Sequence, residues 1–459
     1  MNTVMKIKNI LVIVAVGAAL ASCTDKFFQE YPANSVTEGN FYQTEGDFEQ
    51  AVTCCYVKLK TQSACYITEL AYRSDECVLN SMAVSTADRY DIDHFEEEAA
   101  NGLMSSWWDA WYNGIYRCND VLDHLASKDF TYSTEGQHRG ECLFIRAWFY
   151  SMLYRCFGVV PIVTKVTSPS ESMTVPRCTE DEMYKLLVSD LTEAYELLPE
   201  SYSTEKGRAT KMAAISLLGK MQLTMGKYSE AESTLKTALS QPGYGLTKTT
   251  EAAFDVNNKF NSEWIFGLTY NKTLDGAGHG YWYSSNTGVA ADRLNPTVEF
   301  KSIYDAEKDN RYSLIDDYIK KSNTIYAIRK YNDDYDGTYI TQVGNDWPLL
   351  RYSDIVLLYA EALARNNNLA DACTWMNKTR ERAGLDTFTT GSSTEFFKEL
   401  CDERGREFAI EGQRWFDLVR LGFAGEKFDI DSHEFVFPIP NDQIEIVNDT
   451  DVLWQNPGF

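Results

Sequence analysis

Acidic and basic side chains alternate at helical spacing in one segment near the C-terminus, and they are the residues best suited to acid–base chemistry. They are Glu403, Arg404, Arg406, Glu407, Glu411, Arg414, Asp417 and Arg420. Two of these carboxylates could act as the acid/base pair of a glycoside hydrolase. However, the four interleaved arginines would lower the carboxyl pKa values and leave a poor general acid. Because large apolar side chains share the segment, it predicts a half-buried helix with an ion-pair network, in which Arg414 lies near Glu411 and Asp417.

Motifs for other kinds of catalysis are missing from the sequence. It contains no GxSxG nucleophile elbow, no phosphate-binding GK[ST] loop and no HExxH. The cysteines form no CxxC pair and the histidines no HxxxH spacing, so a structural zinc site is poorly supported. The sequence therefore predicts a non-catalytic protein with no metal and no cofactor. Calcium could assist ligand binding, although no pattern supports it.

Aromatic clusters among small and polar residues offer binding chemistry instead. Tyr281, Trp282 and Tyr283 stand between a glycine-rich run and a Ser-Ser-Asn run, and Arg89 and Tyr90 follow the polar stretch 80–87. Sugar rings can stack on Trp and Tyr faces while Asp, Asn and Arg bind their hydroxyls. These five residues are the candidate ligand contacts. In the alternative interpretation Trp282 fills the core behind a loop; weaker candidates are Tyr326, Tyr331, Tyr335 and Tyr339.

The composition agrees with a binding protein. The 459 residues include 28 Tyr, 10 Trp and 23 Phe, which is more aromatic surface than a core requires. Acidic residues outnumber basic ones 67 to 43, for a net charge of −24. Such a surface repels phosphate backbones, so nucleic acid is excluded as a partner.

The N-terminus has the pattern of a bacterial export signal. Two lysines precede the apolar run ILVIVAVGAAL, and Leu20-Ala21-Ser22-Cys23 follows it, similar to a lipobox. We therefore expect residues 1–22 to be removed and Cys23 to be acylated, and Thr24 at the next position favours the outer membrane. The alternative is an ordinary signal peptide with a chance cysteine. Export permits disulfides, but the sequence does not indicate that any form.

Helical periodicity runs through most of the chain and predicts the elements that must position these residues. The predicted helices are Phe48–Leu59, Ser106–Leu125, Gly136–Phe157, Glu180–Leu198, Arg208–Met225 and Ser229–Leu239. Residues 212–243 and a second stretch from Ser353 resemble the tetratricopeptide repeat, and 136–157 with 180–198 looks like a degenerate copy. Such pairs stack side by side, which predicts a mainly α fold, a helical-pair superhelix with a loop-rich sub-structure. Short strands are expected at 264–270 and 324–328.

Several segments together resemble the SusD/RagB family of outer-membrane nutrient-binding lipoproteins of Bacteroidetes. The matching segments are Arg146–Tyr150 with Phe157–Pro161, the helix Leu350–Ala362, the block ERGREFAIEGQRWFDLVRLG at 403–422, and Phe437–Pro440 with Gln455–Phe459. The resemblance implies a single SusD-like domain over 23–459. Its helical-pair spine is expected at about 40–243 and 349–422, a ligand-binding insert at about 244–348 and a C-terminal tail at 423–459.

The resemblance also implies a function. It indicates a surface-exposed, lipid-anchored protein that captures an oligosaccharide without catalysis and delivers it to a SusC-like TonB-dependent transporter in the outer membrane. RagB-like relatives handle peptides, so a peptide ligand stays open as an alternative. The matching segments are scaffold, so neither the glycan nor its linkage follows from the sequence.

Overall fold

The structure is a computed structural model. It describes residues 41–61, 65, 69–79, 87–271, 294, 296–315, 318–320, 323–325, 328–331 and 344–459. The candidate residues Cys23, Tyr281, Trp282 and Tyr283 lie outside these ranges, as do Tyr326, Tyr335 and Tyr339.

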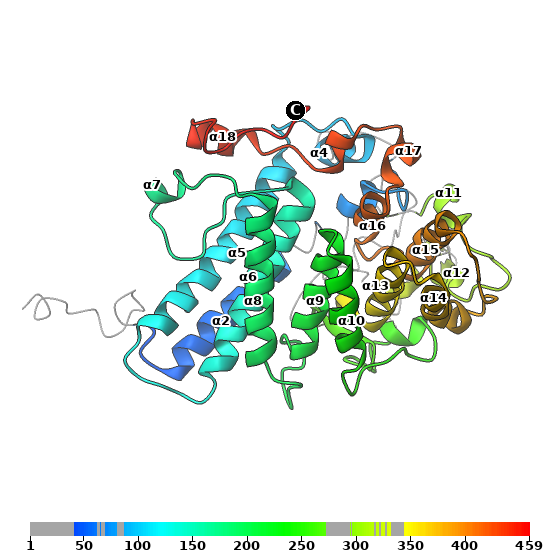
Figure 1. Ribbon diagram of the computed structural model, residues 1–459, viewed down its shortest axis with the longest axis horizontal. Helices are drawn as coiled ribbons and strands as arrows, with labels where there is room; N and C mark the ends of the chain where they lie inside the picture. Colours follow the sequence, from blue (N-terminus) through cyan, green and yellow to red (C-terminus); the bar gives the residue numbers. More distant parts are fainter. Residues whose placement is uncertain are drawn as a thin grey trace, which may run out of the picture. The chain divides into compact units, whose positions relative to one another are not determined.

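The described residues are mainly helical, as predicted (Figure 1). The helices are α2 (Glu45–Thr61), α3 (Leu70–Tyr72), α4 (Ala87–His94), α5 (Gly102–Ser127), α6 (Glu135–Phe157), α7 (Pro169–Ser172), α8 (Glu180–Leu197), α9 (Lys211–Thr224), α10 (Tyr228–Leu239), α11 (Val298–Lys301), α12 (Tyr312–Ile315), α13 (Tyr352–Arg365), α14 (Leu369–Ala383), α15 (Ser393–Glu407), α16 (Arg414–Leu421), α17 (Ala424–Phe428) and α18 (Asn441–Val447). Short 3-10 turns cover Glu251–Phe254, Arg329–Tyr331 and Ser432–Phe435.

The long helices stack side by side in sequence order, which confirms the predicted helical-pair architecture. The row runs α5, α6, α8, α9, α10, α13, α14, with α15 against the last two (Figure 1). The pairs pack closely because small residues face their partners. A Cβ on Gly219 of α9 would lie 2.6 Å from Leu235 Cδ2 of α10, so a larger side chain there would push the helices apart.

Helix boundaries follow local sequence signals. Thr179 caps α8: its side chain accepts from the backbone N–H of Glu182, and the Glu182 carboxylate accepts from the backbone N–H of Thr179. Residues 41–49 include the start of α2, where the backbone N–H of Thr44 donates to Asp47 Oδ2 at 2.8 Å.

Within the described part of the chain, no helix is long and apolar enough to cross a bilayer.

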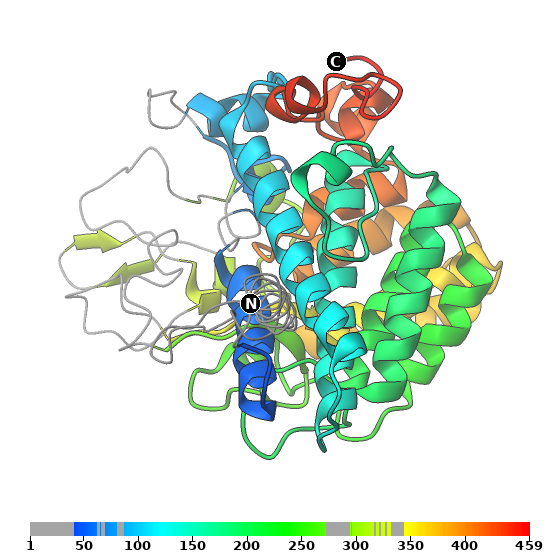
Figure 2. The same cartoon turned by 90° about the vertical axis from the view of Figure 1, so that its left-hand side faces the viewer.

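The segment between α10 and α13 contains the strands. Strand β1 (Trp264–Leu268) pairs antiparallel with β4 (Trp347–Arg351), and β2 (Tyr318–Lys320) pairs with β3 (Asn323–Ile325). The strand predicted at 264–270 is therefore present and two residues shorter, and β3 covers the start of the second predicted strand. The β2–β3 hairpin projects to one side of the described fold, away from α8, α9 and α10 (Figure 2).

The segment 403–422 is not the single half-buried helix that its periodicity predicted. Helix α15 ends at Glu407 and α16 begins at Arg414. Between them Ile410 has φ 55° and Gly412 has φ 69°, so the chain leaves the right-handed helical region. A β-branched residue is strained at positive φ, and tertiary contacts hold Ile410 there: Glu76 Oε1 accepts from its N–H at 2.7 Å and Tyr331 donates to its carbonyl at 2.9 Å.

Candidate functional site

Two of the predicted ligand contacts, Arg89 and Tyr90, lie on the short helix α4. Arg89 Nη2 donates to the buried carboxylate of Glu69, 3.0 Å from Oε1, and keeps its side chain only 13% exposed. The Tyr90 ring stacks on His94, with 3.8 Å between ring centroids and 16° between planes. Both candidates are partly exposed. Arg89 is thus oriented by an ion pair, and Tyr90 forms part of an aromatic stack on α4.

The weaker candidate Tyr331 is a core residue, and its prediction as a ligand contact is wrong. It is buried, its ring stacks on Trp347 with centroids 4.7 Å apart, and its hydroxyl is bound to Ile410. A side chain enclosed in this way cannot meet a ligand.

The two ends of the segment that carries residues 281–283 are fixed to the helical scaffold. At its start, the Tyr270 N–H donates to Asp346 Oδ1 at 2.9 Å, and Lys60 Nζ of α2 lies 4.4 Å from the centre of the Tyr270 ring. At its end, Pro296 forms an antiparallel bridge with Cys77, and the Thr297 N–H donates to the Glu76 carbonyl at 2.9 Å. The chain from Cys77 leads on to α4. The scaffold therefore ties the end of the aromatic segment to the stretch that precedes Arg89.

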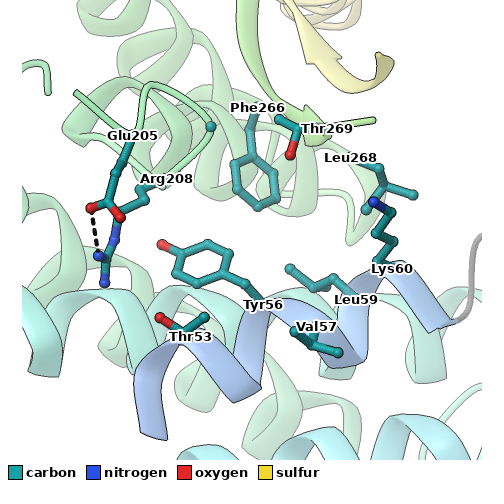
Figure 3. A pocket seen from close by; sticks show the side chains of 12 residues that line it. Thr53, Tyr56, Val57, Leu59, Lys60, Glu205, Arg208, Phe266, Leu268 and Thr269 are labelled. Carbon is teal, nitrogen blue, oxygen red and sulfur yellow. Dashed lines mark hydrogen bonds and ion pairs between the residues drawn. The ribbon is translucent and has the colours of Figure 1, made fainter. Parts of the chain in front are cut away.

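A cavity of about 270 Å³ lies at the start of that segment, between α2, β1 and the turn 205–208 (Figure 3). Tyr56, Leu59 and Phe266 form its apolar floor, and Phe266 itself is buried. Polar side chains stand around its edge, namely Thr53, Lys60, Glu205, Arg208 and Thr269. The turn can approach β1 because residue 207 is glycine; a Cβ there would lie 2.7 Å from Thr269 Cγ2.

The side of the cavity around Tyr56 is held by a buried polar cluster. Tyr56 donates to Glu141 Oε1 at 2.9 Å and accepts from the N–H of Ala209 at 3.0 Å. Arg208 binds the same carboxylate through Nε at 2.6 Å and Nη2 at 3.0 Å, and pairs with Glu205 at 3.0 Å. Burial and the neighbouring Glu141 raise the pKa of Tyr56 well above its usual range, so it remains a neutral donor. The cavity thus combines an apolar floor with a polar edge that carries both positive and negative side chains.

No local pattern in the sequence predicts this cavity. Tyr56 belongs to a helical pattern and Phe266 to a strand pattern, and each is an ordinary core residue in that context. Arg208 and Glu141 are far apart in sequence, and no local spacing joins them. Only the fold brings these residues together.

The carboxylates of the segment 403–420 do not form an acid/base pair. Glu403, Glu407 and Asp417 are buried, and although burial alone would raise their pKa values, the surrounding arginines hold them below the usual range. The Glu407 carboxylate binds three arginines, namely Arg311 at 3.1 Å, Arg351 at 2.9 Å and Arg382 at 2.5 Å. Ionised carboxylates in such a cluster cannot donate a proton to a leaving group. The predicted ion-pair network is present, and apart from the partly exposed Arg382 and Arg420 its named residues are buried.

Arg414 takes part in a different pair from the expected one. Its guanidinium binds Asp75, with Nε 2.7 Å from Oδ1 and Nη2 2.9 Å from Oδ2. Glu411 instead binds Lys330 and Arg351, and Asp417 binds Arg404 and Arg420. The break between α15 and α16 removes the helical spacing between Glu411 and Arg414. Asp417 keeps its helical spacing from Arg414 within α16 but binds Arg404 and Arg420 instead. Among the described residues, no group of three His, Cys, Asp or Glu side chains is placed to hold a metal ion.

Comparison with known proteins assigns the chain to a family. The profile described as "SusD family" matches residues 200–435, and one described as "Starch-binding associating with outer membrane" matches residues 26–223. The chain belongs to the SusD family. This membership confirms the family resemblance, and with it the prediction of a non-catalytic protein.

Individual relatives cover nearly the whole chain. Two SusD-like proteins of Formosa agariphila are 24% and 27% identical; the matches cover 96% of this chain in both cases, and 97% and 94% of the relatives. A crystal structure of a SusD superfamily protein from Bacteroides vulgatus superposes with a TM-score of 0.78 at 24% identity, over 91% of this chain and 100% of that one. Surface glycan-binding protein A from Bacteroides thetaiotaomicron, in complex with laminarihexaose, superposes with a TM-score of 0.75 at 20% identity, over 90% and 99%.

Proposed function

We propose that the protein is a non-catalytic lipoprotein of the cell surface that captures an oligosaccharide and passes it to a SusC-like TonB-dependent transporter. Residues 1–22 act as its signal peptide, and acylated Cys23 anchors it in the outer membrane. The observation that carries the proposal is the match to SusD-like relatives over 96% of the chain. The profile described as starch-binding and the structural likeness to a laminarihexaose-bound protein support a glycan as the ligand.

The ligand site is proposed at the two fixed ends of the aromatic segment. Residues 244–348 act as the binding insert of a single domain over 23–459, carried on a helical spine at about 40–243 and 349–422, with a tail at 423–459. The insert supplies aromatic faces for stacking, from Tyr281, Trp282 and Tyr283. Helix α4 supplies an oriented cation, Arg89, and an aromatic ring, Tyr90, which stacks on His94. The cavity beside Tyr56 offers a further polar-edged surface at the root of the insert.

The glycan is expected to be neutral. The chain carries a net charge of −24, so a polyanion would be repelled except where a cation such as Arg89 stands near. A neutral sugar meets no such penalty, and its ring faces gain from aromatic stacking.

Calorimetric titration of the chain lacking residues 1–23 tests the proposal. Laminarihexaose and maltohexaose serve as neutral glycan probes, a sulfated oligosaccharide as the polyanion and mixed tetrapeptides as the alternative ligand. We expect saturable binding of a neutral glycan and none of the other two. Saturable peptide binding with no glycan response would replace the proposal by a RagB-like function.

A further inference from the structure

A groove lies along α5, between that helix, the segment 161–175 that contains α7, and α18 (Figure 1). It consists of two adjoining pockets, of about 240 Å³ and about 440 Å³, which share Tyr112 and Val163 among their lining residues. Along α5 the lining runs from Trp108 to Tyr116, which is about 12 Å at 1.5 Å per helical residue. The groove shares no lining residue with the cavity between α2 and β1.

Apolar side chains of this groove are exposed to solvent. Tyr116, Met173 and Ile446 line it and are 45%, 39% and 54% exposed. Val175 and Leu453 add further apolar surface at the α18 end. Apolar side chains that gather on one concave surface are typical of a binding site.

Contacts within the protein hold the walls of the groove in place. The Tyr112 ring packs against Trp108, with 5.0 Å between ring centroids, and its hydroxyl donates to the Pro161 carbonyl at 2.7 Å. Asn119 of α5 donates to the Val163 carbonyl at 2.9 Å. These contacts tie the start of the segment 161–175 to α5, so a ligand meets a groove that is already formed.

Two neighbouring carboxylates stand at the α18 end of the groove. Asp109 lines it and accepts from Gln443 Nε2 at 3.1 Å, while Asp442 accepts from the Ser105 hydroxyl at 3.2 Å. Partial burial and the charge of Asp442 raise the pKa of Asp109. Neither carboxylate forms an ion pair with a residue that the structure describes. Each therefore retains a charge that a cation from outside could balance.

The surroundings of this end are acidic. Residues 428–459, which include α18, contain seven acidic side chains and no lysine or arginine. The buried Arg177 donates to two backbone carbonyls and an asparagine side chain, and it lines neither pocket. Lys165 lines the opposite end, near Glu171, whose pKa is lowered by hydrogen bonds from Ser168 and by the charge of Lys165. The α18 end therefore attracts cations.

We propose that this groove binds a segment of a partner protein in which apolar side chains flank a lysine or arginine. The apolar side chains pack against Met173 and Ile446, and the cation lies at Asp109 and Asp442. A length of about 12 Å accommodates three or four residues of extended chain, at about 3.3 Å per residue. A neutral glycan would leave the two carboxylates without a counter-charge. The inference does not rest on the glycan proposal, because it uses none of the same residues.

The test measures fluorescence anisotropy of the dye-labelled peptide acetyl-Leu-Ile-Lys-Phe-Leu-amide with the purified full chain at low salt. We expect saturable binding, and about fivefold weaker binding of the matched peptide with glutamine in place of lysine, because an exposed ion pair is lost. The double variant Asp109→Asn, Asp442→Asn should bind the two peptides alike. Asp129→Asn removes an exposed carboxylate just after α5 and should keep the preference for lysine.

A second variant tests the apolar part of the groove. Ile446→Ser changes an exposed position, so it should weaken both peptides while the melting temperature is kept. Val298→Ser, at another exposed apolar residue, is its control and should bind like the wild type. Displacement of the peptide by laminarihexaose would identify a second glycan site and overturn the proposal. Equal binding of the lysine and glutamine peptides to the wild type, an unchanged affinity of Ile446→Ser, or no saturation up to about 1 mM would also overturn it.

Discussion

Arg414 of α16 and Asp75, 339 positions apart in the sequence, form a two-bonded ion pair with N–O distances of 2.7 and 2.9 Å. Asp75 precedes Glu76 and Cys77, the two residues to which the end of the aromatic segment, Pro296 and Thr297, is attached. The Asp75 carbonyl also accepts from the Thr297 hydroxyl at 2.8 Å. The most characteristic block of the family resemblance thus holds the base of the proposed ligand site in place.

Arg414→Ala should lower the free energy of unfolding by about 2–4 kcal/mol, because it leaves the buried Asp75 with Lys427 as its remaining cationic partner. Denaturant unfolding monitored by circular dichroism measures the change. Arg117→Ala, which removes an exposed arginine, is the control and should change stability by less than about 0.5 kcal/mol. Equal stability of the two variants would show that the Asp75 pair contributes nothing.

The buried Glu76 makes the free energy of unfolding depend on pH. Burial raises its pKa to about 8, although the Ile410 N–H and the cations Arg414 and Lys330 favour the ionised form and Asp75 opposes it. Because the folded pKa lies above the unfolded one, the stability from protonated Glu76 is complete below about pH 4.5 and is lost as pH rises toward 8.

Glu76→Gln keeps an oxygen for the Ile410 N–H and cannot ionise. The variant should therefore match the wild type near pH 5 and be more stable by a few kcal/mol at pH 8. Melting temperatures of both proteins across pH 5–9 check this. A difference that stays constant over the whole range would mean that Glu76 does not titrate with a raised pKa.

Much of the helical scaffold could be predicted from the sequence because its signals are local. The predicted helix Glu180–Leu198 differs from α8 by one residue at its end, since Thr179 and the acidic first turn mark its start. Periodicity and small residues such as Gly219 were sufficient to indicate paired, closely packed helices.

The site could be predicted only in part, because its geometry depends on contacts between distant residues. Helical spacing predicts Arg414 beside Glu411 and Asp417. In the structure the positive φ at Ile410 breaks the helix between Glu407 and Arg414, and the Arg414 guanidinium binds the distant Asp75 rather than either neighbour. The only local hint of that break was Gly412. In the same way, the sequence around Tyr331 suggests an exposed aromatic side chain. In the structure its ring stacks on Trp347 in the core.

Anchoring is tested by Cys23→Ala. Without the thiol that accepts the acyl chains, the protein should leave the membrane fraction, because its attachment rests on buried acyl chains. Cys54→Ala, at an exposed cysteine of α2, is the matched control and should stay in the membrane. Retention of Cys23→Ala in the outer membrane of a strain without the partner transporter would contradict the lipoprotein assignment.

The central claim is that aromatic side chains of the insert hold a glycan, and the most direct measurement is calorimetry with Trp282→Ala and a melt of the same sample. Losing the ring should weaken binding of the neutral glycan about tenfold or more with an unchanged melting temperature, since a stacked Trp anchor contributes about 2 kcal/mol. Trp454→Ala removes an exposed tryptophan elsewhere and should bind like the wild type. Two results would contradict the claim. One is an unchanged affinity of Trp282→Ala for the glycan, and the other is a large drop in its melting temperature, which would show that Trp282 is a core residue.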